Sequence, residues 1–190
     1  MTEPAPLPHI PFWYLRHGQT DWNAQNLSQG NIDIPLNETG IAQAHEAAAK
    51  LVGLGITTII SSPLSRARVT AEIAGNALGL PVHFDEELRE VSFGVQEGQP
   101  MGDWYADWVT DQFTPEGAES FLKLRTRAAA AISRAQGRPP MVLIVAHGAL
   151  FRAVRRLMGL EPNFRTQNAL PILCTPPTIP GTPWTLDTRE

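Results

Sequence analysis

Short apolar runs alternate with amphipathic segments along this chain, and that alternation constrains the fold more than any other feature. The aromatic-rich residues 10–15, the short run 57–60 and the fully apolar run 141–146 are typical of buried strands. Helices are predicted where apolar residues recur every three or four positions, over residues 39–53, 62–78, 121–135 and 150–157. Strands that alternate with helices in this way predict an α/β fold with a largely parallel sheet and helices on both faces.

Capping residues mark the starts of two of these helices. Thr39 precedes the first helical run and is its predicted N-cap. Ser62 followed by Pro63 is a typical start for the second, since proline is favoured in the first turn of a helix. With that start, Arg66 lies in the first turn of the second helix.

Two segments lack a clear period. Residues 98–115 are interpreted as a variable, lid-like insertion, in which Trp104 and Trp108 would share one face if the segment is helical. Such tryptophans are more typical of packing than of a substrate platform. The tail after Cys174 is rich in proline and predicts at most a short edge strand over residues 182–186.

Composition narrows the classes of partner and compartment. The length of 190 residues suits one domain, residues 1–190, and the net charge of −4 gives no general attraction to nucleic acid. Cys174 is the single cysteine, and the N-terminal sequence has no signal-peptide pattern. The strongest apolar run is far shorter than the roughly 20 residues of a membrane helix. We therefore expect a cytoplasmic protein with neither a nucleic-acid nor a membrane partner, and the sequence does not predict its oligomeric state.

Cationic side chains follow three separate strand predictions. Arg16 and His17 follow the first strand, Arg66 follows the second, and His147 with Gly148 follows the strand at 141–146. Because the carboxyl ends of parallel strands share one edge of a sheet, these residues are expected to meet there. Guanidinium groups bind phosphate oxygens in pairs, and an imidazole nitrogen can attack phosphorus to form a phosphohistidine. The pattern predicts a site for a phosphate ester.

A departing alkoxide needs a proton, so a carboxyl group is expected near this edge. Glu90 is the candidate, and Glu86, Glu87 and Glu97 are its close rivals.

Several sequence blocks, taken in order along the chain, resemble those of a known family. They are residues 15–20 (Leu-Arg-His-Gly-Gln-Thr) with 22–23, residues 29–40, residues 61–67 (Ser-Ser-Pro-Leu-Ser-Arg-Ala) with 70–72, residues 88–98, residues 119–120, residues 145–148 (Val-Ala-His-Gly) and residues 168–169. Together they resemble the histidine phosphatase, or phosphoglycerate-mutase-like, superfamily over residues 12–174. Several blocks in order are far more specific than one arginine-histidine-glycine triplet.

The resemblance implies a three-layer α/β/α sandwich around a mostly parallel sheet, and a role for each matching residue. Those roles are His17 as nucleophile, Arg16, Arg66 and His147 as phosphate ligands, Glu90 as general acid, and Asn23 with Gly148 as pocket lining. No metal or cofactor is implied, and the expected partner is a small phosphate ester.

Two activities remain open on these residues. One is hydrolysis of a small phosphorylated metabolite through a phosphohistidine. The other is the reaction of a cofactor-dependent phosphoglycerate mutase, which passes the phosphoryl group to another hydroxyl of the same substrate. The length favours hydrolysis, and so does the absence of arginine and lysine from residues 98–115, where such mutases hold the substrate carboxylate. Arg155 and Arg156 lie in a different block. A phosphate-binding module without activity conflicts with the presence of His17, Glu90 and His147, and a zinc hydrolase would need a ligand cluster that the sequence does not offer.

Overall fold

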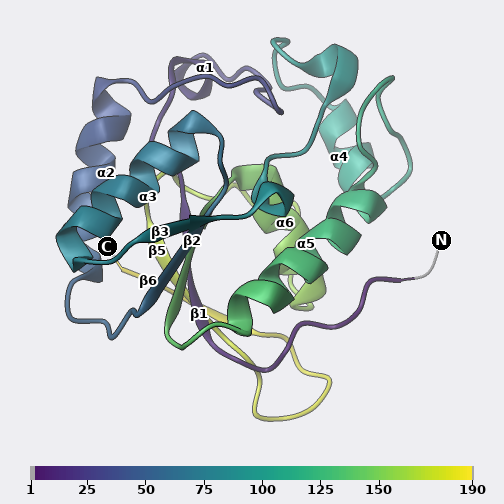
Figure 1. Ribbon diagram of the computed structural model, residues 1–190. Coiled ribbons are helices and arrows are strands. Elements are labelled where there is room, and N and C mark those ends of the chain that lie inside the picture. Colours follow the sequence, from purple (N-terminus) through teal and green to yellow (C-terminus); the bar gives the residue numbers. More distant parts are fainter. Residues whose placement is uncertain (1–2, 190) are drawn as a thin grey trace.

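The computed structural model of the protein describes residues 3–189 and contains a six-stranded sheet (Figure 1). The strands are β1 (Phe12–Arg16), β2 (Thr58–Ser61), β3 (Val82–Phe84), β4 (Val142–Ala146), β5 (Pro171–Thr175) and β6 (Thr185–Thr188). They lie in the order β3-β2-β4-β1-β5-β6. Neighbouring strands from β3 to β1 are parallel, whereas β5 and β6 pair antiparallel with their neighbours.

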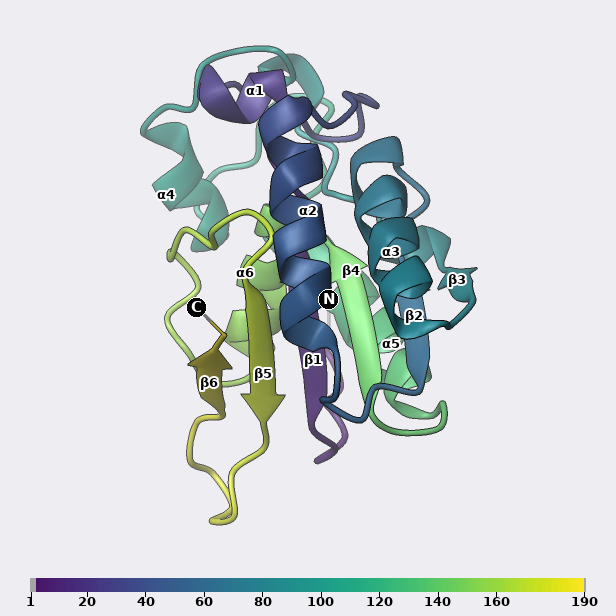
Figure 2. The same cartoon turned by 90° about the vertical axis from the view of Figure 1, so that its left-hand side faces the viewer.

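Helices cover both faces of this sheet. They are α1 (Asp21–Ala24), α2 (Glu38–Leu51), α3 (Ser65–Leu78), α4 (Trp104–Val109), α5 (Phe121–Gln136) and α6 (Gly148–Leu157), with short 3-10 turns at Glu86–Leu88 and Gly94–Gln96. Helices α2 and α3 lie on one face, and α5 and α6 lie on the other (Figures 1 and 2). The predicted three-layer α/β/α sandwich around a mostly parallel sheet is confirmed.

The apolar core follows the two-residue period of the strands. In β1, Phe12 and Tyr14 are buried toward α5 and α6, while Trp13 and Leu15 are buried toward α2 and α3. Strand β4 is fully buried over its whole length, which explains its unbroken apolar sequence. No helix among residues 3–189 is long and apolar enough to cross a membrane.

The parallel strands end at the edge of the sheet that lies beneath α1 and α4 (Figures 1 and 2). The chain leaves β1 in close contact with the start of α2. A Cβ at Gly18 would lie 2.3 Å from the Gly40 carbonyl oxygen, and one at Gly40 would lie 2.0 Å from that of Gln19. Both glycines are therefore required for this approach, which fixes the loop that carries His17.

Details of several predicted elements differ in the structure. The side chain of Asn37, not of Thr39, caps α2 and accepts a hydrogen bond from the Gly40 N–H. Helix α3 begins at Ser65, and the Ser62 hydroxyl accepts the Leu64 N–H in the turn before it. Residues 98–115 do contain a helix, α4, and the terminal strand lies at 185–188 rather than 182–186.

Candidate active site

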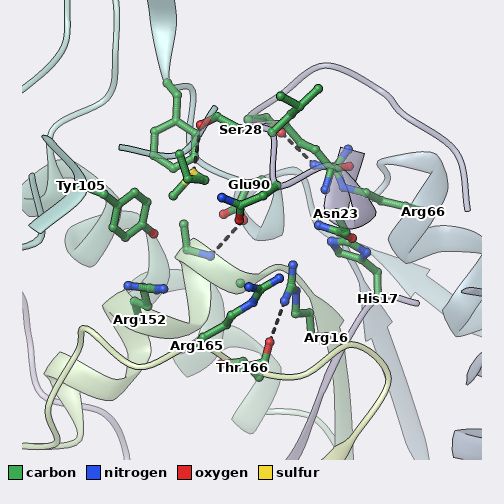
Figure 3. A pocket seen from close by; sticks show the side chains of 18 residues that line it. Arg16, His17, Asn23, Ser28, Arg66, Glu90, Tyr105, Arg152, Arg165 and Thr166 are labelled. Carbon is green, nitrogen blue, oxygen red and sulfur yellow. Dashed lines mark hydrogen bonds between the residues drawn. The ribbon is translucent and has the colours of Figure 1, made fainter. Parts of the chain in front are cut away.

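A pocket of about 280 Å³ opens at the carboxyl ends of the parallel strands (Figure 3). Its lining is Arg16, His17, Asn23, Asn26, Leu27, Ser28, Gln29, Gly30, Arg66, Glu90, Phe93, Met101, Tyr105, Gly148, Ala149, Arg152, Arg165 and Thr166. Four arginines and one carboxyl group are present in this set. The pocket therefore has a strong excess of positive charge, which suits an anionic ligand.

The ring of His17 is oriented by the backbone of the residue that follows it. Its Nδ1 lies 2.7 Å from the Gly18 carbonyl oxygen. Because a carbonyl oxygen only accepts, Nδ1 carries the proton and Nε2 keeps its lone pair. Burial, followed by the charges of Arg66 and Arg16, holds the pKa of His17 well below 6.5. The imidazole is therefore neutral at physiological pH, with a nucleophilic nitrogen.

Arg66 is fully buried and Arg16 is half-buried, and backbone carbonyl groups hold both side chains. Arg16 Nη1 donates to Thr166 O at 2.6 Å, and Arg66 donates through Nη1 to Ile32 O at 2.8 Å and through Nη2 to Gly30 O at 2.7 Å. The Nε atom of each arginine is buried without a partner in residues 3–189. Burial lowers the pKa of both guanidinium groups to about 10, so they remain charged and offer free N–H donors.

His147 lies next to His17, with 5.3 Å between the ring centroids. The Tyr14 hydroxyl donates to its carbonyl oxygen at 2.8 Å, and Nε2 lies 2.7 Å from the Ser62 Oγ. His147 is fully buried and does not appear in the pocket lining, and its Nδ1 has no partner within the described part of the chain. If Ser62 donates to Nε2, then Nδ1 carries a proton and is free to donate.

Glu90 faces the start of α6. Its Oε1 accepts the N–H groups of Val91 at 3.0 Å and Leu150 at 2.9 Å, and its Oε2 accepts that of Ala149 at 2.9 Å. A carboxylate oxygen has two lone pairs, so Oε2 keeps one that can carry a proton.

Asn23 and Gly148 complete the part of the pocket that the sequence predicted. Asn23 Oδ1 accepts from Thr20 N and from Asn168 Nδ2, both at 3.2 Å, which leaves its amide NH₂ free to donate. A Cβ at position 148 would lie 3.2 Å from Arg16 Nε. Glycine there lets the helix approach this guanidinium group closely.

Comparison with known proteins assigns the family. The model of the histidine phosphatase superfamily (branch 1) matches residues 12–174. The chain belongs to this superfamily. It is 39% identical over 176 residues to the probable phosphoglycerate mutase GpmB of Escherichia coli O1:K1, covering 84% of this chain and 81% of that one.

Solved structures of similar proteins agree with this assignment. A mycobacterial glucosyl-3-phosphoglycerate phosphatase in complex with VO₃ superposes with a TM-score of 0.82 at 29% identity, over 95% of this chain and 99% of that one. A mutant phosphoserine phosphatase from Entamoeba histolytica in complex with phosphoserine gives 0.78 at 27% identity, over 95% and 96%.

In this member of the superfamily, the rivals of Glu90 have other contacts. Glu86 forms an exposed ion pair with Arg89 at 3.1 Å. Glu97 Oε1 accepts the N–H groups of Asn31 at 3.0 Å and Phe93 at 3.1 Å, and so joins two loops. Glu87 is exposed. Glu90 is the only carboxyl group that lines the pocket within the described part of the chain.

Helix α4 contributes a pocket residue that differs from the two tryptophans considered in the sequence. Trp108 is fully buried against Phe93 and Phe121, and Trp104 packs on Phe93; neither tryptophan lines the pocket. Their packing interpretation is confirmed, and Tyr105, which lies between them in the sequence, is the residue that faces the pocket.

Two further arginines of the pocket were not predicted. Arg152 lies on α6 one helical turn after Gly148, so the four-residue spacing could have placed it on the same face. Arg165 lies in an irregular loop after α6, where no periodic signal exists.

Proposed function

We propose that this chain is a phosphomonoester hydrolase that acts on a small phosphorylated metabolite through a phosphohistidine at His17. The observation that carries the proposal is the neutral His17 ring, whose unprotonated Nε2 lies in a pocket with two carbonyl-held guanidinium groups. A nucleophile beside fixed cations is the arrangement that phosphoryl transfer requires.

The reaction proceeds in two displacements. The Nε2 lone pair of His17 forms an N–P bond while the P–O bond to the alcohol breaks, and the departing oxygen takes a proton from Glu90 Oε2. Water then attacks phosphorus and gives a proton to the Glu90 carboxylate. The N–P bond breaks, its electron pair returns to Nε2, and inorganic phosphate leaves.

The other residues stabilise the charge of the transferring group. Arg16 and Arg66 donate to its equatorial oxygens through the N–H groups that their backbone contacts leave free. Asn23 donates through its free amide, and Gly148 leaves room for Arg16. His147 supports the site from behind His17, with Nδ1 as its available donor.

Phosphoglycerate mutase activity is a second candidate, because a relative at 39% identity is named a probable phosphoglycerate mutase. The sequence argument against it was the lack of cations in residues 98–115, but Arg152 and Arg165 reach the pocket from other segments. Hydrolysis is favoured because two structural neighbours are named phosphatases, of glucosyl-3-phosphoglycerate and phosphoserine respectively.

The test is a metabolite panel with EDTA present, in which released inorganic phosphate is measured. The panel includes 3-phosphoglycerate with and without its bisphosphate cofactor. If the chain is a hydrolase, inorganic phosphate is released. Brief exposure to labelled substrate should also leave an acid-labile, base-stable label on the protein, and His17→Ala should abolish that label. Isomerised product without phosphate release would support the mutase, and stable label on a serine or another histidine would exclude His17 as the nucleophile.

A further inference from the structure

We propose that Arg152, Arg165 and Tyr105 form a subsite for a second anionic group of the substrate, so that the substrate is a phosphorylated acid. This inference rests on the proposed function, because it places the transferring phosphoryl group at His17, Arg16 and Arg66. The second anionic group is a carboxylate or another phosphate, and both offer oxygens that guanidinium groups bind in pairs.

The first argument is the excess of cationic over anionic side chains in the pocket, which has four arginines and a single carboxyl group, that of Glu90. The four pocket arginines form no ion pair with a carboxylate within residues 3–189, although Glu90 lies beside them. A phosphoryl dianion is matched by Arg16 and Arg66, so Arg152 and Arg165 provide charge for a further anion.

Arg152 is held in place before any ligand arrives. Its guanidinium carbon lies 4.5 Å from the centroid of the Tyr105 ring, and Nη1 donates to Asn163 Oδ1. A guanidinium group has five N–H donors in a fixed plane, so most of them remain available. The stacking and the amide contact reduce the side-chain freedom that binding would otherwise remove.

Tyr105 supplies a neutral donor at the same place. It is buried, its ring lines the pocket, and its hydroxyl points into the pocket in Figure 3. Burial raises the pKa of Tyr105 above its ordinary value of 10, so the hydroxyl keeps its proton and donates to an anion.

Arg165 connects this subsite to the phosphoryl site. Figure 3 shows it between Arg152 and Arg16. Burial is the main cause that lowers the pKa of Arg16, and the charge of Arg165 lowers it further, as expected of a near neighbour. In a pocket of about 280 Å³, the two anionic groups of one small ligand are separated by only a few bonds.

The experiment compares pairs of substrates that differ by one carboxylate: 3-phosphoglycerate with glycerol 3-phosphate, and phosphoserine with phosphoethanolamine. Values of kcat/KM are measured for the wild type, Arg152→Met and Arg165→Met. Arg156→Met is the matched control, because Arg156 is exposed on the same helix and does not line the pocket. A third pair, fructose 1,6-bisphosphate with fructose 6-phosphate, tests phosphate as the second group.

We expect Arg152→Met to reduce kcat/KM at least about 10-fold for the acidic member of a pair and less than about threefold for its partner, as for the loss of a charged hydrogen bond. Arg165→Met should lower the same ratio, and Arg156→Met should leave it unchanged. The pair with the larger effect identifies carboxylate or phosphate as the second group. Equal losses on both members of every pair, or no loss, would overturn the subsite.

A binding measurement separates this inference from the proposed reaction. Calorimetric titration of His17→Ala with 3-phosphoglycerate and glycerol 3-phosphate needs no turnover. The subsite is supported if 3-phosphoglycerate binds more tightly than glycerol 3-phosphate and if adding Arg152→Met to this variant reduces the difference. This result would support the subsite even if the wild type hydrolyses no ester. Equal affinity for the two ligands would overturn it, even if the wild type is an active phosphatase.

Discussion

The Glu90 carboxyl group has a single free lone pair beyond those that its three backbone N–H donors occupy, and that lone pair is on Oε2. If this oxygen delivers the proton to the leaving group, the need for it should increase with the basicity of the leaving group. Alkyl phosphates release a strongly basic alkoxide, whereas p-nitrophenolate leaves without a proton.

Glu90→Gln is therefore expected to slow pre-steady-state transfer from alkyl phosphates by about 10²–10⁴-fold and to affect p-nitrophenyl phosphate much less. The amide NH₂ would also face a backbone N–H, so stability should fall by about 1–3 kcal/mol. Glu97→Gln is the control, since Glu97 also accepts backbone N–H groups but does not line the pocket. Equal slowing of both esters by Glu90→Gln would exclude Glu90 as the acid.

The two buried histidines lead to a second prediction, on how the stability of the protein depends on pH. Burial and the nearby Arg66 hold the pKa of both His17 and His147 well below 6.5. The unfolded chain binds protons at both rings below pH 6.5 and the folded chain does not, so stability is complete above that pH and decreases as the pH falls below it. Each ring contributes a slope of up to about 1.4 kcal/mol per pH unit.

His147→Gln should remove one of these contributions and make the decrease shallower between roughly pH 6.5 and 5. Urea denaturation at a series of pH values measures the slope, and His83→Gln, an exposed position on β3, should leave it unchanged. Parallel curves for the wild type and His147→Gln would show that His147 takes up a proton in the folded protein.

At the scale of single residues, the sequence predicted those parts of the site that follow a strand directly. Arg16 and His17 leave β1, and His147 with Gly148 leaves β4, so strand order alone brought them together. Arg165 and Tyr105 could not be predicted in this way. Their positions depend on an irregular loop and on the packing of a short helix, which have no period in the sequence.

Among the secondary-structure elements, helix α4 has residues with two different roles: its tryptophans pack against other aromatic residues, whereas Tyr105 lines the pocket. Trp108 is fully buried, and its Nε1 donates to Glu119 O at 2.9 Å. Trp108→Phe removes this donor and opens a void, so we expect a loss of about 1–3 kcal/mol in the free energy of unfolding. The ranking of substrates should stay the same, because Trp108 does not line the pocket. Chemical denaturation and a substrate panel check the two parts, and a changed ranking with normal stability would contradict this division.

Sequence periodicity predicted the long elements and missed the short or exposed ones. Helices α2, α3 and α5 have 14 to 16 residues, enough for the apolar spacing to repeat several times. Strand β3 has only three residues and lies at the sheet edge, where no further strand among residues 3–189 pairs with it. Two of its three residues are exposed, so no apolar pattern is required. The antiparallel pairing of β5 depends on contacts with β1, which local sequence does not encode.

At the scale of the whole molecule, the excess of positive charge in the pocket predicts that oxyanions which bind there stabilise the folded protein. A ligand that binds only the folded state at a hundredfold its Kd stabilises by about 2.7 kcal/mol, or roughly 5–10 °C in Tm for a chain of this size. Phosphate or orthovanadate should therefore raise the Tm by that order. Arg66→Met should largely abolish the shift, while Arg134→Met, which breaks a surface ion pair, should not. An equal shift in both variants would place the anion elsewhere.

The same crowding of guanidinium groups has an evolutionary consequence. Burial lowers the pKa of Arg16 and of Arg66, and neither forms an ion pair with a carboxylate within residues 3–189. The ligand-free fold therefore carries the cost of two desolvated charges, which an inactive relative would be free to lose. Selection for turnover therefore acts against selection for thermal robustness at these positions. Descendants that abandon catalysis should replace these arginines early, and laboratory evolution for heat resistance alone should converge on the same two codons.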